Sequence, residues 1–231
     1  MKALLLLSLL GACLPMPVAV AGEVGFAGVL PNGALYTRPV ESMHEARYRN
    51  LVRQHTDYSC GAAALATILR YAYHLETDEA MVIEGMMGVS DPSLVQQRGF
   101  SLLDIKRYVE SLGMRGRGYR IDGDRLRSLR VPGLVLMDVR GFRHFVVLKQ
   151  VVGEYVEVAD PILGNRSLPL DEFLAAWPSR AVFVVIGSDF DRNTVLLQPS
   201  GRPSARALYA RQGPITDAEL VDFGFTHADL F

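Results

Sequence analysis

The spacing of apolar side chains divides the chain into a helical first part and a strand-rich second part. Apolar residues at intervals of three and four predict amphipathic helices, whereas short apolar runs bounded by glycine or proline predict strands. The expected helices cover residues 60–73, 80–83, 101–112, 124–130 and 170–177. The expected strands cover residues 118–121, 133–139, 144–151, 155–160 and 181–186. Helices followed by consecutive strands indicate an α+β fold and not a doubly wound one.

The composition is that of a folded globular protein. Of the 231 residues, 49% are hydrophobic and 21% are charged, and the formal net charge is -1. Such a balanced charge provides neither a basic footprint for nucleic acid nor a polybasic patch for a membrane surface. We therefore expect one folded domain with extensions, and nucleic acid is not among its expected partners.

The first 21 residues have the features of a secretory signal peptide. Met1-Lys2 is a positive start, Ala3–Leu10 is an apolar run, and Ala19-Val20-Ala21 is a small-x-small cleavage site. The apolar run is too short to span a membrane. We expect cleavage after Ala21 and a periplasmic mature protein. An alternative is lipidation of Cys13, because residues 10–13 resemble a lipoprotein cleavage box.

Changes in composition suggest further boundaries in the mature chain. Residues 22–49 are glycine-rich and then arginine-rich, and they are expected to form an arm or linker with a hairpin turn at Asn32-Gly33. Residues 50–187 contain the periodic segments and form the expected domain. Residues 188–231, with prolines at positions 199 and 203, are expected to be a C-terminal extension.

Cys60 is the strongest candidate for chemistry. Removal of the signal peptide would leave it as the only cysteine, so it could not form an internal disulfide. It stands at the start of an expected helix that Ser59 and Thr56 could cap. The unpaired N–H groups and the dipole at a helix N-terminus favour a thiolate, which is the nucleophilic form. The alternative is an inert, buried structural cysteine.

A cysteine nucleophile needs a base, a group that orients the base, and donors for an oxyanion. His144 begins an expected strand, and Asp160 ends the next one. A simple hairpin would place Asp160 opposite residues 146–148, and a bulge could bring it closer to His144. Asp160 could then fix the histidine tautomer. The Cys60 N–H and the Gln54 side-chain amide are candidate oxyanion donors.

No metal or other cofactor is expected. His55 and Asp57 flank the nucleophile, but the sequence contains no second ligand pair at tight spacing. We therefore interpret both as surface or subsite residues.

Several of these segments together resemble cysteine peptidase family 39, the papain-like peptidases that remove double-glycine leaders from exported peptides. The resemblance covers residues 50–187 and rests on residues 54–61 with the alanine-rich helix that follows, residues 144–148 and Asp160-Pro161. It implies a papain-like α+β fold with N-terminal helices packed on an antiparallel sheet. It also implies that Cys60 is the nucleophile, His144 the base and Asp160 the orienting carboxylate, with Gln54 in the oxyanion hole.

Family members usually precede the membrane and ATPase domains of a transporter. This sequence shows an export signal instead, so it resembles the stand-alone exported members, such as the one in a functional-amyloid secretion system. The expected function is hydrolysis of a peptide bond in another exported protein, with other secretion components as possible partners. A peptide-binding domain without turnover and a different acyl transfer on the same triad remain open.

Overall fold

The computed structural model describes residues 23–26, 36–39 and 43–198, and it contains two units, residues 1–49 and 50–231. In the first unit, strands β1 (Glu23–Phe26) and β2 (Tyr36–Pro39) pair antiparallel, as expected for a hairpin. Residues 43–47, expected as linker, form the short helix α1 (Met43–Arg47). The expected signal peptide, Cys13 and the Asn32-Gly33 turn lie outside the described residues.

The described part of the second unit, residues 50–198, combines six α-helices with one six-stranded antiparallel sheet. The helices are α2 (Cys60–Tyr73), α3 (Glu79–Met87), α4 (Pro92–Arg98), α5 (Leu102–Ser111), α6 (Gly123–Leu126) and α7 (Leu170–Ala175). The strands are β3 (Arg115–Arg120), β4 (Gly133–Val139), β5 (Phe142–Val152), β6 (Tyr155–Asp160), β7 (Gly164–Pro169) and β8 (Ala181–Ile186).

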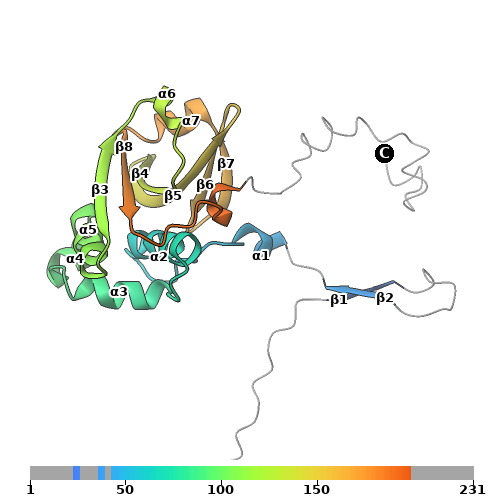
Figure 1. Ribbon diagram of the computed structural model, residues 1–231, viewed down its shortest axis with the longest axis horizontal. Coiled ribbons are helices and arrows are strands. Elements are labelled where there is room, and N and C mark those ends of the chain that lie inside the picture. Colours follow the sequence, from blue (N-terminus) through green and yellow to red (C-terminus); the bar gives the residue numbers. More distant parts are fainter. Residues whose placement is uncertain (1–22, 27–35, 40–42, 199–231) are drawn as a thin grey trace, which may run out of the picture. The chain divides into compact units, whose positions relative to one another are not determined.

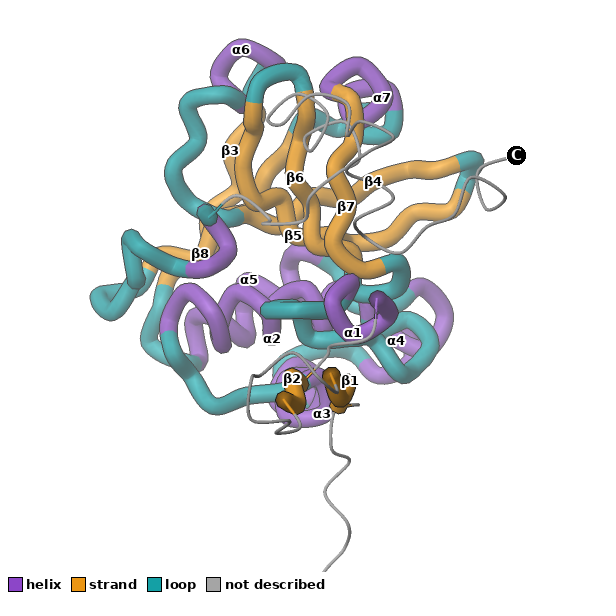
Figure 2. The backbone as a smooth tube through the Cα atoms, turned by 90° about the vertical axis from the view of Figure 1, so that its right-hand side faces the viewer, coloured by secondary structure: helices purple, strands orange, loops and turns teal. Residues whose placement is uncertain are grey.

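The strands follow the spatial order β3-β8-β4-β5-β6-β7. Helices α2 to α5 lie together below the strands in Figure 1, whereas α6 and α7 lie above them, and Figure 2 shows the same separation. Among the described residues, no helix is both long enough and apolar enough to cross a membrane. The expected α+β arrangement, with N-terminal helices against an antiparallel sheet, is confirmed.

The central strand β5 is buried on both faces from His144 to Lys149, and its successive side chains point to opposite sides of the sheet. Val146 and Leu148 of β5 belong to an apolar cluster with Phe173 and Trp177. Phe145, one residue away, instead contacts α2 at Gly61. Strand β5 is therefore held between two apolar layers, and its first residues lie next to the start of α2.

Helix α4 and strand β7 were also not expected from the sequence. Helix α4 begins at Pro92 and is capped by Asp91, whose side chain accepts hydrogen bonds from the N–H groups of Ser93 and Leu94. Strand β7 pairs with β6 along its whole length although its sequence, GNRSLP, is mostly polar. An edge strand with one neighbour does not need a continuous apolar pattern.

The chain that follows β8 continues to pack on α2. The backbone N–H of Asp191 donates to Ala72 O at 2.8 Å, and the Thr194 hydroxyl donates to Tyr71 O. A 3-10 turn, η1 (Val195–Leu197), then buries Leu196 completely. Residues 188–198, expected as the beginning of the extension, thus share the core of the second unit.

Candidate active site

Cys60 is the first residue of α2 and is partly exposed, whereas the alanines that follow it are buried. The expected cap by Ser59 is wrong. Its hydroxyl makes no capping bond to α2 and instead lies 2.6 Å from Thr56 O and 2.5 Å from Glu79 Oε1. The first N–H groups of α2 therefore receive no side-chain cap from Ser59, and they remain available near the thiol.

The expected lowering of the Cys60 pKa is also wrong. Burial raises the pKa of the Cys60 thiol above its ordinary value, although the N–H groups of Phe145 and Gly61 partly oppose this. The nearby Asp160 charge raises it further. Desolvation disfavours a thiolate more than these donors favour it, so the resting thiol keeps its proton. A base must remove that proton when the sulfur attacks.

His144 and Asp160 form a buried pair. His144 Nε2 lies 2.9 Å from Asp160 Oδ2, and the two residues are 4% and 1% exposed. The other carboxylate oxygen accepts from the N–H groups of Ile162 and Leu163 at 2.9 and 3.0 Å. Burial raises the pKa of Asp160, but the His144 and backbone hydrogen bonds outweigh it and hold this pKa below its ordinary value. Asp160 is therefore an ionised acceptor.

A β-bulge in β5 gives Asp160 this position. The pairing with β6 runs from Val152↔Tyr155 to Gln150↔Glu157, then shifts by one residue to Leu148↔Val158. Without the shift Asp160 would lie beside Val147, whose side chain points to the opposite face from His144. With it, Asp160 lies beside Val146, on the same face as His144. The bulge considered from the sequence is thus present.

The ionised Asp160 can only accept, so we assign the ring proton of neutral His144 to Nε2. Nδ1 then carries the lone pair, and in the described part of the chain this buried atom has no hydrogen-bond partner. The Cys60 thiol lies close to His144, because the backbone N–H of Phe145, the residue after His144, hydrogen-bonds to the thiol. The three expected triad residues therefore come together from α2, β5 and β6.

Gln54 is held on the segment that precedes α2. Its backbone N–H donates to Pro161 O at 3.0 Å, which connects it to the end of β6. Its side-chain nitrogen donates to Thr56 O at 2.8 Å, and its side-chain oxygen is buried without a partner among the described residues. An amide nitrogen has two hydrogens, and one of them is fixed here. The second remains available for an oxyanion.

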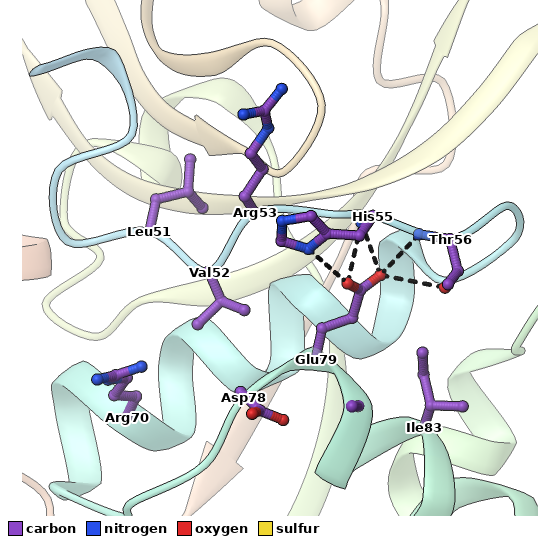
Figure 3. Close-up of a pocket in the computed structure, with 10 residues that line it drawn as sticks. Leu51, Val52, Arg53, His55, Thr56, Arg70, Asp78, Glu79 and Ile83 are labelled. Atoms are coloured by element: carbon purple, nitrogen blue, oxygen red, sulfur yellow. Dashed lines mark hydrogen bonds and ion pairs between the residues drawn. The ribbon is translucent and has the colours of Figure 1, made fainter. Parts of the chain in front are cut away.

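Glu79, which directly precedes the expected helix at residues 80–83, contacts this segment. It borders a cavity of about 480 Å³ between residues 51–56 and the helices α2 and α3 (Figure 3). Its carboxylate accepts from His55, Thr56 and Ser59. No pattern in the sequence indicates this role, because the partners lie 20 to 24 positions before Glu79. Among the described residues no metal-binding cluster of His, Cys, Asp or Glu occurs.

Known proteins are similar to this chain over most of its length. The model of the peptidase C39 family matches residues 48–189. The chain is 50% identical to the "Probable functional amyloid protease FapD" of Pseudomonas aeruginosa over 211 residues, which are 91% of this chain and 92% of that protein. The protein of the same name from Pseudomonas fluorescens is 47% identical with the same coverage.

A solved structure is similar as well. It is a double glycine motif protease from an AMS/PCAT transporter in complex with the leader peptide, and it superimposes with a TM-score of 0.51. The sequence identity is 27%, and the match covers 60% of this chain and 91% of that one. Sequence and fold thus indicate the same group of proteins.

Proposed function

Because the chain belongs to the peptidase C39 family and is therefore a cysteine peptidase, we propose that Cys60, His144 and Asp160 form its catalytic triad. The observation that carries this assignment is the buried His144–Asp160 pair, which leaves Nδ1, next to Cys60, without a hydrogen-bond partner among the described residues. A buried nitrogen without a hydrogen-bond partner lowers the stability of the fold. A role in accepting the thiol proton explains why the protein keeps it in this state.

In the proposed reaction, Cys60 Sγ attacks the carbonyl carbon of the scissile bond while its proton moves to His144 Nδ1. The Cys60 N–H and the Gln54 amide stabilise the resulting oxyanion. Collapse breaks the C–N bond, and Nδ1 returns the proton to the leaving amine. Water then attacks the thioester, again with His144 as the base, which releases the acid and restores the thiol. Asp160 keeps His144 in place throughout and stabilises the imidazolium each time it forms.

The proposed substrate is a segment of another exported polypeptide. Two similar proteins carry the name functional amyloid protease, and the similar solved structure holds a leader peptide. We place the mature protein in the periplasm, on the basis of residues 1–21. Amyloid-forming proteins secreted by the same cell are accordingly the first substrates to test, and secretion components are candidate partners.

The test uses protein that starts at Gly22 and a library of unstructured peptides, with new termini identified by mass spectrometry. The wild type should cleave a defined subset, and Cys60→Ala should leave the whole library intact although it still folds. If the wild type binds peptides but never cleaves them, the chain is a binding domain and the proposal fails. Products joined to another amine, instead of hydrolysed, would indicate a different acyl transfer. The cleaved peptides also reveal whether glycine pairs precede the cut.

A further inference from the structure

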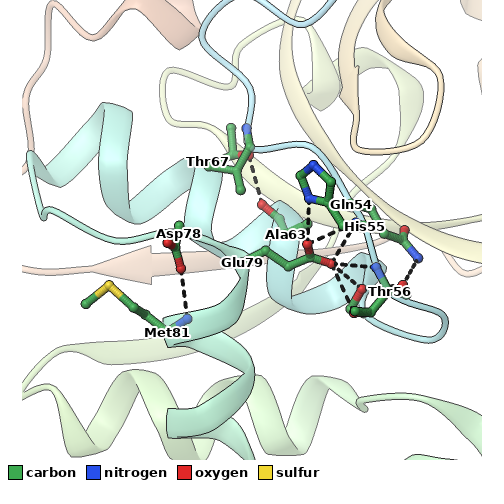
Figure 4. A network of polar contacts seen from close by, with 10 residues as sticks. Gln54, His55, Thr56, Ala63, Thr67, Asp78, Glu79 and Met81 are labelled. Carbon is green, nitrogen blue, oxygen red and sulfur yellow. Dashed lines mark hydrogen bonds and ion pairs between the residues drawn. The ribbon is translucent and has the colours of Figure 1, made fainter. Parts of the chain in front are cut away.

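We propose that Glu79 is a positioning residue for the oxyanion hole, a role that rests on the proposed function of Gln54. Glu79 is the first residue of α3, and only 6% of it is exposed. Its hydrogen bonds go to the segment directly before Cys60 and not to its own helix. Figure 4 shows this convergence of donors on one carboxylate.

The carboxylate joins three residues of that segment. Oε2 accepts from the His55 N–H and from His55 Nδ1, both at 2.9 Å. Oε1 accepts from the Thr56 N–H at 3.3 Å, the Thr56 hydroxyl at 3.2 Å and the Ser59 hydroxyl at 2.5 Å. Burial raises the pKa of Glu79, but these donors outweigh it and hold the pKa below its ordinary value. Glu79 is thus an ionised group that only accepts.

Thr56 transmits this restraint to Gln54. Glu79 holds the N–H and hydroxyl of Thr56, and the carbonyl oxygen of Thr56 receives the Gln54 side-chain nitrogen at 2.8 Å. That single bond determines where the second amide hydrogen of Gln54 points. If Thr56 moves, the proposed oxyanion donor moves with it. Oxyanion stabilisation depends on donors that are already in place.

Other groups already fulfil the ordinary structural tasks of this region. Asp78, the preceding residue, caps α3 by accepting from the Met81 N–H at 2.9 Å. The start of α3 therefore does not need the Glu79 carboxylate. A buried charge is retained against its desolvation cost only where several donors require it. Here all of those donors belong to the segment that carries Gln54 and leads to Cys60.

The test is a double-mutant cycle on a peptide cleaved in the library experiment. Gln54→Ala should lower kcat by about 10²–10³. Glu79→Gln should lower kcat by roughly 10–100-fold, with KM changed less than about twofold, since only the transition state uses the donor. The double variant should be no slower than Gln54→Ala alone, within about threefold, because both changes remove one interaction. Glu84→Gln, an exposed change on the same helix, should match the wild type.

Multiplicative losses in the double variant would overturn the inference, because Glu79 would then act independently of Gln54. A normal kcat in Glu79→Gln together with a lowered kcat in Gln54→Ala would overturn only the inference about Glu79. The proposed function would not be affected. Normal kcat in Gln54→Ala would refute the oxyanion assignment and this inference together. If Glu79→Gln does not fold, Glu79→Asp replaces it. This variant keeps the negative charge but shortens the side chain by one bond. It should lower kcat by the same factor as expected for Glu79→Gln and leave KM nearly unchanged.

Discussion

The two carboxylate oxygens of Asp160 accept hydrogen bonds from two different sets of donors. This asymmetry determines the expected effect of a substitution at Asp160. Oδ2 receives the His144 ring, and Oδ1 receives two backbone N–H groups from the turn after β6. A carboxylate can satisfy both sets because each oxygen accepts. An amide has only one accepting oxygen, so one of the two sets of donors would lose its acceptor.

Asp160→Asn should therefore inactivate almost as strongly as Asp160→Ala. The two backbone N–H groups should hold the amide oxygen, which turns the NH₂ group toward Nε2. His144 would then carry its proton on Nδ1, where it cannot accept the thiol proton. We expect kcat/KM to fall by about 10³–10⁴ at pH 7. Steady-state kinetics on a cleaved peptide measure this, with the exposed Asp171→Asn as control. A loss below tenfold would contradict the tautomer assignment.

The raised pKa of Cys60 gives a prediction about its reactivity. At pH 7 a thiol with a raised pKa has a smaller thiolate fraction than free cysteine. The rate of alkylation by iodoacetamide should therefore rise with pH around a midpoint above that of free cysteine. Protein that starts at Gly22 contains no other cysteine, so mass spectrometry reads this site alone. A plateau reached below pH 7 would instead show a preformed thiolate–imidazolium pair.

Sequence alone could locate Cys60, His144, Asp160 and Gln54, because each stands at a recognisable place: a helix start, a strand start, a strand end and the segment before a helix. Their roles stay predictions until the variants are measured. Neither Glu79 nor the direction of the Cys60 pKa shift could be found in this way. Both depend on burial and on donors that only the folded chain brings together.

Between elements, the contact of α2 with β5 determines how the nucleophile faces the base. Gly61 follows Cys60, and Phe145 follows His144. A Cβ atom on Gly61 would lie 3.2 Å from Phe145 Cδ2 and 3.4 Å from Ile105 Cδ1. These distances leave no room for a methyl group without a shift of a few tenths of an ångström.

Gly61→Ala should therefore move β5 away from α2 and widen the gap between Cys60 and His144. Since a misplacement of about 1 Å can cost 10²-fold, we expect kcat to fall roughly tenfold with little change in KM. Phe145→Leu, which shortens the opposing side chain, should restore part of the loss in the double variant. Steady-state kinetics at a temperature where both variants are folded test this. A normal kcat in Gly61→Ala would rule out this spacing effect.

Elements with strong local signals were predicted well. The capping box of Ser101 and Asp104 starts α5, and both of its hydrogen bonds are present. Helix α4 was missed because a proline that starts a helix also resembles a break. Strand β7 was missed because its polar sequence becomes a strand only through pairing with β6.

For the molecule as a whole, the position where the folded domain ends can be tested through the free energy of unfolding of truncated chains. A chain that ends at Gly187 would lose the completely buried Leu196 and the hydrogen bonds of Asp191 and Thr194 to α2. Burial of a leucine contributes about 1.5–3 kcal/mol, and each hydrogen bond about 1 kcal/mol. The free energy of unfolding should therefore be about 3.5–5 kcal/mol lower than for a chain that ends at Gln198.

Urea unfolding of the two truncated chains measures that difference, and Leu196→Ala in the longer chain should reproduce most of it. Equal unfolding midpoints would show that residues 188–198 add nothing and would support a boundary at residue 187.

The bulge in β5 has a further consequence, for the comparison of relatives. His144 and Asp160 are 16 positions apart, an even number. In an unbulged hairpin with the same two-residue turn, residues on one face of neighbouring strands are an odd number of positions apart. An even number of positions between the histidine and the aspartate therefore indicates a bulge, and an odd number indicates none. A relative with a spacing of 15 or 17 and the same turn should have a regular ladder here, and a one-residue alignment gap between the pair would then mark a real structural difference.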